Sequence, residues 1–397
     1  MPKKSLESCP TVSTLENPGL GTRIKHLLGL GNKGARSSSH TPENLVPGIA
    51  LGGGGALGLS HIGVLNVLTS AGIHFPIISG TSMGAIIGAS YACGTLDLSE
   101  QMALSLTRQA VLEWADLYWD GGLLKGDVVE DVLRKLTKGL AFRDLRNRGI
   151  TLIIVACNLD SGKPVYINEG DIARAVRASM SIPGLFVPVH TNGTTLVDGG
   201  LVDNVPTDII HKLGANFTMG VDVSNTGDIW ALAKSGIMLS ARTADLMRQR
   251  IKEIVSDTKS THFRHIERYH EVIDNIFTEK LGASAKEAFS RLYVNYKSTG
   301  DGRIKENTPT GTAQKEVGYN WSGIKAILQS ADIMNEAMDL HRAGKLNPFK
   351  PDVLLKPNTR PFHAHQFYKA EELIEAGRQA AKTALPNTRI LLGMKGP

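Results

Sequence analysis

The sequence has 397 residues, of which 42% are apolar and 21% charged, a composition that supports a large folded core and excludes a disordered chain. Basic residues exceed acidic ones by only 6, and no Lys- or Arg-rich run is interleaved with aromatic residues, so a nucleic-acid binder is not expected. The cysteines Cys9, Cys93 and Cys157 lie far apart without metal-ligand spacing, which favours a reducing compartment.

The beginning of the chain shows no regular pattern. Residues 1–46 mix Ser, Thr, Pro, Gly and charged residues, and we expect a flexible arm there. No apolar segment of signal-peptide length follows the basic start. Residues 44–96 contain no Asp, Glu, Lys or Arg, but Gly, Pro and Asn interrupt the stretch too often for a membrane-spanning helix. We therefore expect a cytoplasmic protein, or one peripheral to a membrane.

Two strand–turn–helix units follow the arm. Residues 49–51 predict a short buried strand, followed by a run of glycines and a helix through 61–68 that ends at Gly72. Residues 77–79 predict a second strand and 83–91 a second helix. Apolar strands that are each followed by a helix indicate an α/β fold, with three layers and a mostly parallel sheet covered by helices on both faces.

The rest of the chain continues this pattern with one interruption. Residues 237–325 carry 15 Lys or Arg and 11 Asp or Glu with mostly helical periodicity, and we interpret about 240–325 as a helical insertion. The expected domain spans 47–388, with a C-terminal tail at 389–397. Further strands are predicted at 151–156, 165–167, 195–197, 217–223 and 352–355, and further helices at 99–113, 126–138, 172–180, 207–213 and 370–384.

The turn after the second predicted strand carries a possible nucleophile. Residues 80–84 read Gly-Thr-Ser-Met-Gly, which fits the G-x-S-x-G elbow at a strand-to-helix turn. Such an elbow exposes its serine, here Ser82, and needs small residues such as Gly80 and Gly84 so that helix and strand can pass closely. In a glycine-rich chain, the same pattern also fits an ordinary structural turn.

The turn after the first predicted strand is a run of glycines. Residues 52–58 read Gly-Gly-Gly-Gly-Ala-Leu-Gly, and consecutive glycines at a helix N-terminus leave backbone N–H groups open to an oxyanion or a phosphate. Gly53, Gly55 and Gly58 also satisfy the dinucleotide motif G-x-G-x-x-G. That alternative predicts an acidic residue at the end of the second strand, and residues 79–82 contain none.

A carboxylate follows a later strand. Residues 198–200 read Asp-Gly-Gly, which in isolation is most simply a turn. Together with the two motifs above, it supplies a nucleophile, a set of donors and a carboxylate, each at the end of a predicted strand. Open parallel sheets place their active sites at that edge, so we expect the three motifs to meet there.

At these motifs the sequence resembles the patatin-like phospholipases, a family of lipid acyl hydrolases. The glycine signature of that family is similar to residues 53–58, its elbow to 80–84 and its base motif to 198–200, in the same order and spacing. One departure is Leu57, where many family members carry Arg or Lys. The likeness extends to 59–65, 178–184 and 351–355, and covers roughly 48–240 and 326–384.

The resemblance implies a Ser–Asp dyad acting on a phospholipid or another acyl ester, with no cofactor and no metal. Ser82 would attack the ester carbonyl, Asp198 would act as the base, and the N–H groups of Gly53, Gly54 and Gly55 would form the oxyanion hole. A carboxylate shielded by an apolar neighbourhood is a stronger base than one in water. The glycines that would support these motifs are Gly58, Gly80, Gly84, Gly199 and Gly200.

Two other functions remain open at this point. A Ser–Asp–His triad of the α/β-hydrolase type would use His363 or His365, although the elbow comes after only one earlier strand–helix unit. A catalytically silent lipid-binding scaffold would keep the fold without the chemistry, and the intact motifs disfavour it.

The insertion suggests contact with a lipid surface. Its apolar residues are interleaved with Arg248, Arg250 and Lys252, a pattern that fits either a membrane surface or ordinary packing. Its histidines match no common metal site, and a solvated helical face is the favoured interpretation; they are His262, His265 and His270.

Overall fold

The computed structural model describes residues 45–107, 126–183, 185–224, 330, 333 and 349–394. The predicted insertion at 240–325 and its basic residues and histidines lie outside the described residues, as does nearly all of the predicted N-terminal arm.

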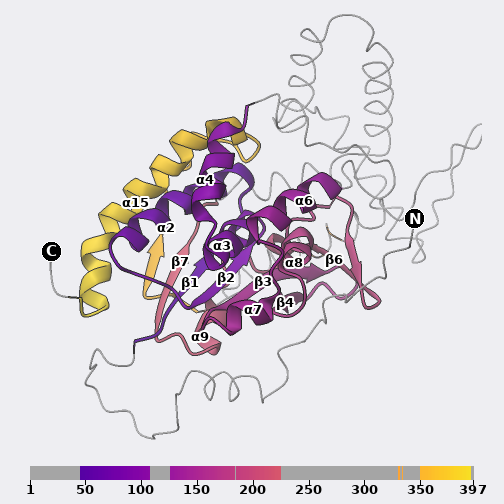
Figure 1. Ribbon diagram of the computed structural model, residues 1–397, viewed down its shortest axis with the longest axis horizontal. Helices are drawn as coiled ribbons and strands as arrows, with labels where there is room; N and C mark the ends of the chain where they lie inside the picture. The colour runs from indigo at the N-terminus through magenta and orange to yellow at the C-terminus, as the bar shows by residue number, and fades with distance from the viewer. Residues whose placement is uncertain are drawn as a thin grey trace, which may run out of the picture.

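The described strands form one mixed sheet with eight strands (Figure 1). Their order is β5-β6-β3-β2-β1-β7-β8, and β4 pairs with β3 beside this path. The pairs β1–β2, β1–β7, β2–β3 and β7–β8 are parallel, whereas β4 and β6 run antiparallel to β3, and β5 runs antiparallel to β6. The strands are β1 (Pro47–Leu51), β2 (Ile77–Thr81), β3 (Thr151–Asn158), β4 (Pro164–Ile167), β5 (Val189–Thr191), β6 (Thr194–Asp198), β7 (Phe217–Val221) and β8 (Val353–Leu355).

Helices cover the sheet on both sides, which confirms the predicted mostly parallel α/β architecture. Most of them lie on the side that faces the viewer in Figure 1, whereas α9 packs against β1, β2 and β7 on the opposite side. The α-helices are α2 (Ser60–Ser70), α3 (Met83–Cys93), α4 (Leu96–Ser105), α6 (Asp127–Leu136), α7 (Phe142–Arg146), α8 (Ile172–Ser179), α9 (Thr207–Lys212) and α15 (Ala370–Leu391). The short 3₁₀ helices are η2 (Gly55–Leu59), η3 (Gly199–Leu201) and η4 (Phe367–Lys369).

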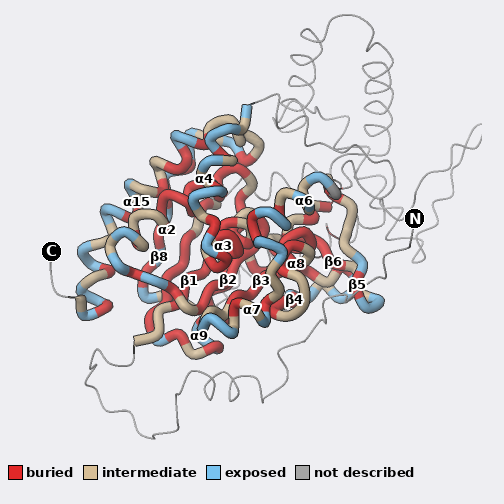
Figure 2. Tube along the Cα trace, in the orientation of Figure 1, coloured by how far each residue is buried: buried red, intermediate tan, exposed pale blue. Residues whose placement is uncertain are grey.

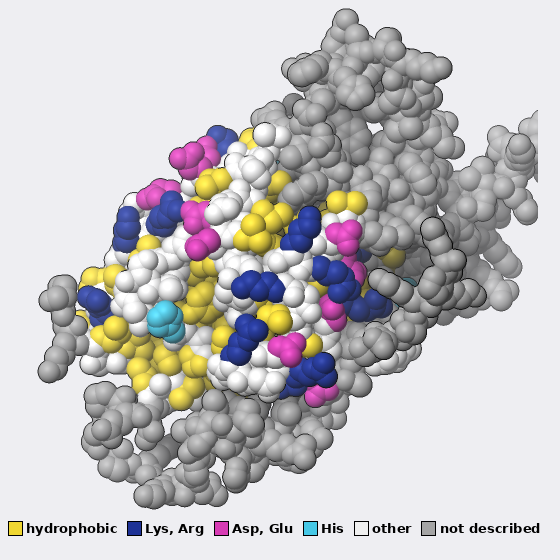
Figure 3. Space-filling model, viewed as in Figure 1, with side chains coloured by type: hydrophobic (Ala, Val, Ile, Leu, Met, Phe, Trp, Pro, Cys, Tyr) yellow, Lys and Arg dark blue, Asp and Glu magenta, His cyan; other side chains and the backbone are white. Residues whose placement is uncertain are grey.

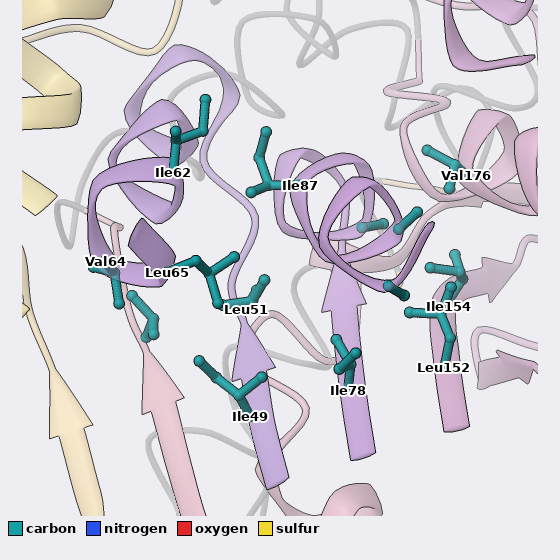
Figure 4. Close-up of a cluster of buried hydrophobic side chains, with 14 of the residues drawn as sticks. Ile49, Leu51, Ile62, Val64, Leu65, Ile78, Ile87, Leu152, Ile154 and Val176 are labelled. Atoms are coloured by element: carbon teal, nitrogen blue, oxygen red, sulfur yellow. The ribbon is translucent and has the colours of Figure 1, made fainter. Parts of the chain in front are cut away.

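The core follows from the alternation of side chains along the central strands. In β1, Ile49 and Leu51 join the large apolar cluster under α2 and α3, whereas Ala50 joins the smaller cluster with α9 (Figure 4). All three side chains are fully buried, and Figure 2 shows buried residues along the whole centre of the sheet. Burial of one such Ile or Leu side chain contributes roughly 1.5–3 kcal/mol of transfer free energy. The charge-free stretch of sequence is therefore the centre of the core.

The structure departs from the predicted elements in a few places. Helix α4 ends at Ser105, where Leu106 turns to extended backbone, so its described part is shorter than the predicted 99–113. Two short elements, α7 and β5, were not predicted, because neither is long enough to show a period. Helix α15 continues to Leu391, past its predicted end at residue 384, since Thr388 and Leu392 are buried and anchor its last turn.

Candidate active site

Ser82 occupies the one-residue turn between β2 and α3. Its backbone φ of 53° and ψ of −120° fall in a region that residues with a side chain rarely adopt. The elements on either side approach closely: a β-carbon at Gly84 would lie 2.1 Å from the carbonyl oxygen of Leu51, and one at Gly80 would lie 2.5 Å from that of Gly84. The elbow therefore needs glycine at both positions.

The Ser82 hydroxyl is directly hydrogen-bonded to a carboxylate. Ser82 Oγ donates to Asp198 Oδ2 at 2.7 Å, and Asp198 Oδ1 accepts the N–H of Gly200 at 2.7 Å. Ser82 and Asp198 are each only 7% exposed. Burial raises the pKa of Asp198 to about 6, although the hydrogen bonds from Gly200 and Ser82 lower it. The carboxylate is therefore ionised at neutral pH and more basic than a solvated aspartate.

The route by which Asp198 reaches Ser82 differs from the sequence prediction. Asp198 ends β6, but β6 runs antiparallel to β3, so its end does not belong to the parallel edge invoked above. Asp198 pairs with Ala156, one residue beyond the position where Val155 pairs with Thr81. Because β6 pairs only with the last residues of β3, its C-terminal end meets the same edge from the opposite direction. The next residue, Gly199, packs directly against β3: a β-carbon on Gly199 would lie 2.3 Å from the carbonyl oxygen of Val155.

The end of α8 holds both members of this pair, a contribution that sequence reasoning missed. Ser179 Oγ accepts the backbone N–H of Ser82 at 2.8 Å and donates to the carbonyl of Val155 at 2.5 Å. The carbonyl of Ser181 accepts the N–H of Asp198 at 3.0 Å. Both serines are fully buried. The sequence did contain a sign of this contribution: residues 178–184 are part of the resemblance to the family, although no function was predicted for them.

The glycine run lies beside Ser82, and its backbone N–H groups have different partners. A β-carbon at Gly53 would lie 3.1 Å from the β-carbon of Ser82, so the loop touches the nucleophile. The Gly53 N–H donates to the backbone and side-chain oxygens of Asn204, at 3.3 and 3.2 Å. Within the described residues, the N–H groups of Gly54 and Gly55 have no hydrogen-bond acceptor. The free donors in the loop are therefore those of Gly54 and Gly55.

The far side of the glycine run is also fixed. Gly55 has a φ of 56°, and a β-carbon there would lie 2.5 Å from the carbonyl oxygen of Ala364, which accepts the N–H of Ala56 at 2.7 Å. Gly58 packs against the side chain of Met83, at the start of α3, where a β-carbon would lie within 2.4 Å. Leu57 is fully buried in the core, so this position is an apolar core site.

The histidines of the alternative triad do not join this pair. Apart from its bond with Ser82, the Asp198 carboxylate accepts only the Gly200 N–H within the described part of the chain. His363 and His365 stack on one another at 5.8 Å between ring centroids, on the loop before η4.

Comparison with known proteins places part of the chain beside a known family. Residues 49–211 match the family model described as "Patatin-like phospholipase". This part of the chain is similar to the patatin-like phospholipases. Ser82, Asp198 and the glycine run all lie within the matched residues of this patatin-like domain.

The relatives of the patatin-like domain include both uncharacterized and named proteins. An uncharacterized NTE family protein of Mycobacterium tuberculosis is 28% identical over 345 residues, which cover 85% of this chain and 90% of that protein. Lysophospholipase nte1 of Aspergillus fumigatus is 33% identical over 198 residues, 46% of this chain and 12% of that protein. Patatin-like phospholipase domain-containing protein 6 of Homo sapiens is 32% identical over 191 residues, 45% of this chain and 13% of that protein.

Proposed function

We propose that this chain is a serine lipid acyl hydrolase of the phospholipase A or lysophospholipase type. The observation that carries the proposal is the 2.7 Å hydrogen bond from the Ser82 hydroxyl to Asp198, beside a loop with two free N–H donors. A nucleophile, a base and oxyanion donors are the parts that acyl transfer needs.

In the first half-reaction, Ser82 Oγ bonds to the acyl carbonyl carbon while its proton moves to Asp198 Oδ2. The negative charge on the carbonyl oxygen is stabilised by the N–H groups of Gly54 and Gly55, which need no cationic side chain. When the tetrahedral intermediate collapses, the ester C–O bond breaks and the leaving alkoxide takes the proton from Asp198. This leaves an acyl-enzyme on Ser82 and an ionised Asp198.

In the second half-reaction, Asp198 accepts a proton from water as the water oxygen attacks the acyl-enzyme. Collapse then breaks the bond to Ser82 Oγ, which regains its proton from Asp198, and the free fatty acid leaves. The raised pKa of Asp198 suits both directions of proton transfer, because a base with a pKa near the working pH both accepts and returns a proton readily.

We also propose that the enzyme works at a lipid surface as a peripheral protein. No helix in the ranges that the structure describes is long and apolar enough to cross a bilayer. On the face seen in Figure 3, Lys and Arg side chains are interspersed with Asp and Glu. We assign the proposed lipid contact to segment 240–325, because its sequence interleaves basic and apolar residues. Neutralising Arg248, Arg250 and Lys252 should weaken binding to anionic vesicles, since each basic residue near such a surface contributes about 1 kcal/mol, and should leave hydrolysis of a soluble ester unchanged.

The test of the proposed function is a lipid panel. Purified wild-type protein and Ser82→Ala are incubated with phospholipids, lysophospholipids and neutral glycerides, and the released fatty acid is measured. We expect release by the wild type and none above background by Ser82→Ala. Equal release by both proteins, or none by the wild type on any lipid, would contradict the proposal and favour the lipid-binding scaffold.

A further inference from the structure

A buried histidine on α2 contacts the start of the glycine run. His61 is fully buried, and its Nε2 lies 2.7 Å from the carbonyl oxygen of Gly52. Because a carbonyl oxygen only accepts hydrogen bonds, Nε2 carries the proton and donates it. Burial lowers the pKa of His61 to about 4, so the ring is neutral and its Nδ1 is unprotonated. Nδ1 has no hydrogen-bond partner among the residues that the structure describes, so within them the ring makes a single polar contact, with the glycine run.

The peptide bond that begins at Gly52 is held at its other end by Asn204. The Gly52 carbonyl and the Gly53 N–H belong to the same peptide plane and point in opposite directions. The Asn204 side chain accepts the Gly53 N–H at 3.2 Å and donates to the Gly53 carbonyl at 3.4 Å. Asn204 lies in the loop that follows Asp198 and η3. The Gly52–Gly53 peptide is therefore held on one side by His61 of α2 and on the other by Asn204 of the loop after η3.

The two free donors lie between this peptide and a second fixed point. Beyond Gly55, the Ala56 N–H is bound by the carbonyl of Ala364 at 2.7 Å. The backbone of Gly54 and Gly55 itself has no side chain to restrict it. Its orientation therefore depends on how firmly the flanking peptides are held, and oxyanion donors act only if they are oriented before the reaction begins.

We infer that His61 and Asn204 are positioning residues that hold the Gly52–Gly53 peptide, and so orient the oxyanion donors of Gly54 and Gly55 toward the acyl group on Ser82. The inference rests on the proposed hydrolase function. Neither side chain touches the reacting atoms. Each acts through the backbone of the loop.

The test separates positioning from folding by comparing two replacements of His61. His61→Leu removes the Nε2–H donor and keeps an apolar side chain, whereas His61→Gln retains an N–H donor at a similar reach. For a soluble short-chain ester, His61→Leu should lose about 10²-fold in kcat with KM little changed, the size of effect expected when reacting groups are slightly misplaced. His61→Gln should recover most of that loss. Leu68→Ala, a buried change on the same helix, should lower Tm and leave kcat unchanged.

A substitution of Asn204 tests the same positioning role independently of His61. Asn204→Ala should also lower kcat, by less than His61→Leu, because the backbone oxygen of Asn204 still accepts the Gly53 N–H. The double variant should lose less than the product of the single effects, since both side chains hold one peptide.

The outcomes distinguish this inference from the proposed function. If the wild type releases no fatty acid, or if Ser82→Ala remains active, the hydrolase proposal fails. If the activity depends on Ser82 but folded His61→Leu keeps the wild-type kcat, the positioning role is wrong. Should His61→Leu not fold, Asn204→Ala decides instead, and an unchanged kcat in that folded variant overturns the inference.

Discussion

The turns that follow strands β1 and β2 have similar glycine-rich sequences but different structures. Both follow central parallel strands, β1 and β2, and both are rich in glycine. After β2, a single residue joins strand to helix, and Ser82 has its own N–H bound by Ser179. After β1, the chain passes through a longer loop and η2, and two N–H groups keep no acceptor among the described residues. The turn after β2 therefore exposes a side chain, that of Ser82, whereas the loop after β1 exposes backbone N–H groups.

The difference shows how glycine serves two purposes at one site. At Gly84 the missing side chain lets helix and strand approach, because a β-carbon would collide with Leu51. In the loop after β1, the missing side chains leave N–H groups open beside Ser82. The nucleophile and the donors are thus separate elements, and changes in one turn should affect chemistry differently from changes in the other.

The largest expected effect, apart from loss of the nucleophile, concerns the base. Asp198→Asn should reduce hydrolysis of a soluble ester by about 10²- to 10⁴-fold, because the amide cannot accept the Ser82 proton. His363→Ala and His365→Ala should retain most of the rate, measured by steady-state kinetics. A comparable loss of hydrolysis rate in either folded histidine variant would favour the Ser–Asp–His triad and contradict the Ser–Asp dyad.

The next effect concerns the donors. Gly54→Val should lower kcat by about 10²- to 10³-fold, the usual cost of losing one oxyanion donor, because its β-carbon would collide with Val223 and shift the loop. NAD and NADP should give no thermal shift with the wild type. Saturable cofactor binding would instead assign the loop to a dinucleotide.

A smaller effect is expected from pH. The base is active only when ionised, so the rate on a soluble ester should be flat above about pH 6 and should fall about tenfold per pH unit below it, reflecting the raised pKa of Asp198. The measurement is a pH profile of kcat/KM. A half-maximal rate near the ordinary aspartate pKa of 3.8 would show that burial does not tune this carboxylate.

The smallest effect is on stability. The pKa of Asp198 is about 6 in the folded protein against 3.8 for the ordinary group, so the folded state binds this proton more tightly than the unfolded state. Its contribution to the free energy of unfolding should therefore fall by roughly 1–3 kcal/mol as pH rises from about 4 to about 6. Urea unfolding of Asp198→Asn should lack this decrease. An identical pH dependence in both proteins would contradict it.

Local patterns were enough to predict the central elements. Strand β3 is a nearly continuous apolar run, and short apolar stretches mark β1 and β2. The glycine run and the elbow follow β1 and β2, and the Asp-Gly-Gly motif follows β6. The direction of β6 could not be predicted, because strand polarity in a sheet depends on pairing with β3 and not on the residues of β6. The sequence therefore placed Asp198 at the correct edge for an incorrect reason.

The partners of the site were harder to predict because they come from distant parts of the chain. Gly53 and Asn204 are separated by 151 positions, and Ser82 and Ser179 by 97. No local period reports such contacts. The glycine run alone gave three equivalent donors, and only the contact with Asn204 distinguishes Gly53 from Gly54 and Gly55.

The most direct test of the account is to trap the nucleophile. Wild-type protein is treated with a fluorophosphonate probe, digested and mapped by mass spectrometry, with Ser82→Ala as the control. We predict a single adduct on Ser82, and no adduct in Ser82→Ala. An adduct on another serine, or no adduct in a wild type that hydrolyses lipid, would contradict the assignment of Ser82 as the nucleophile.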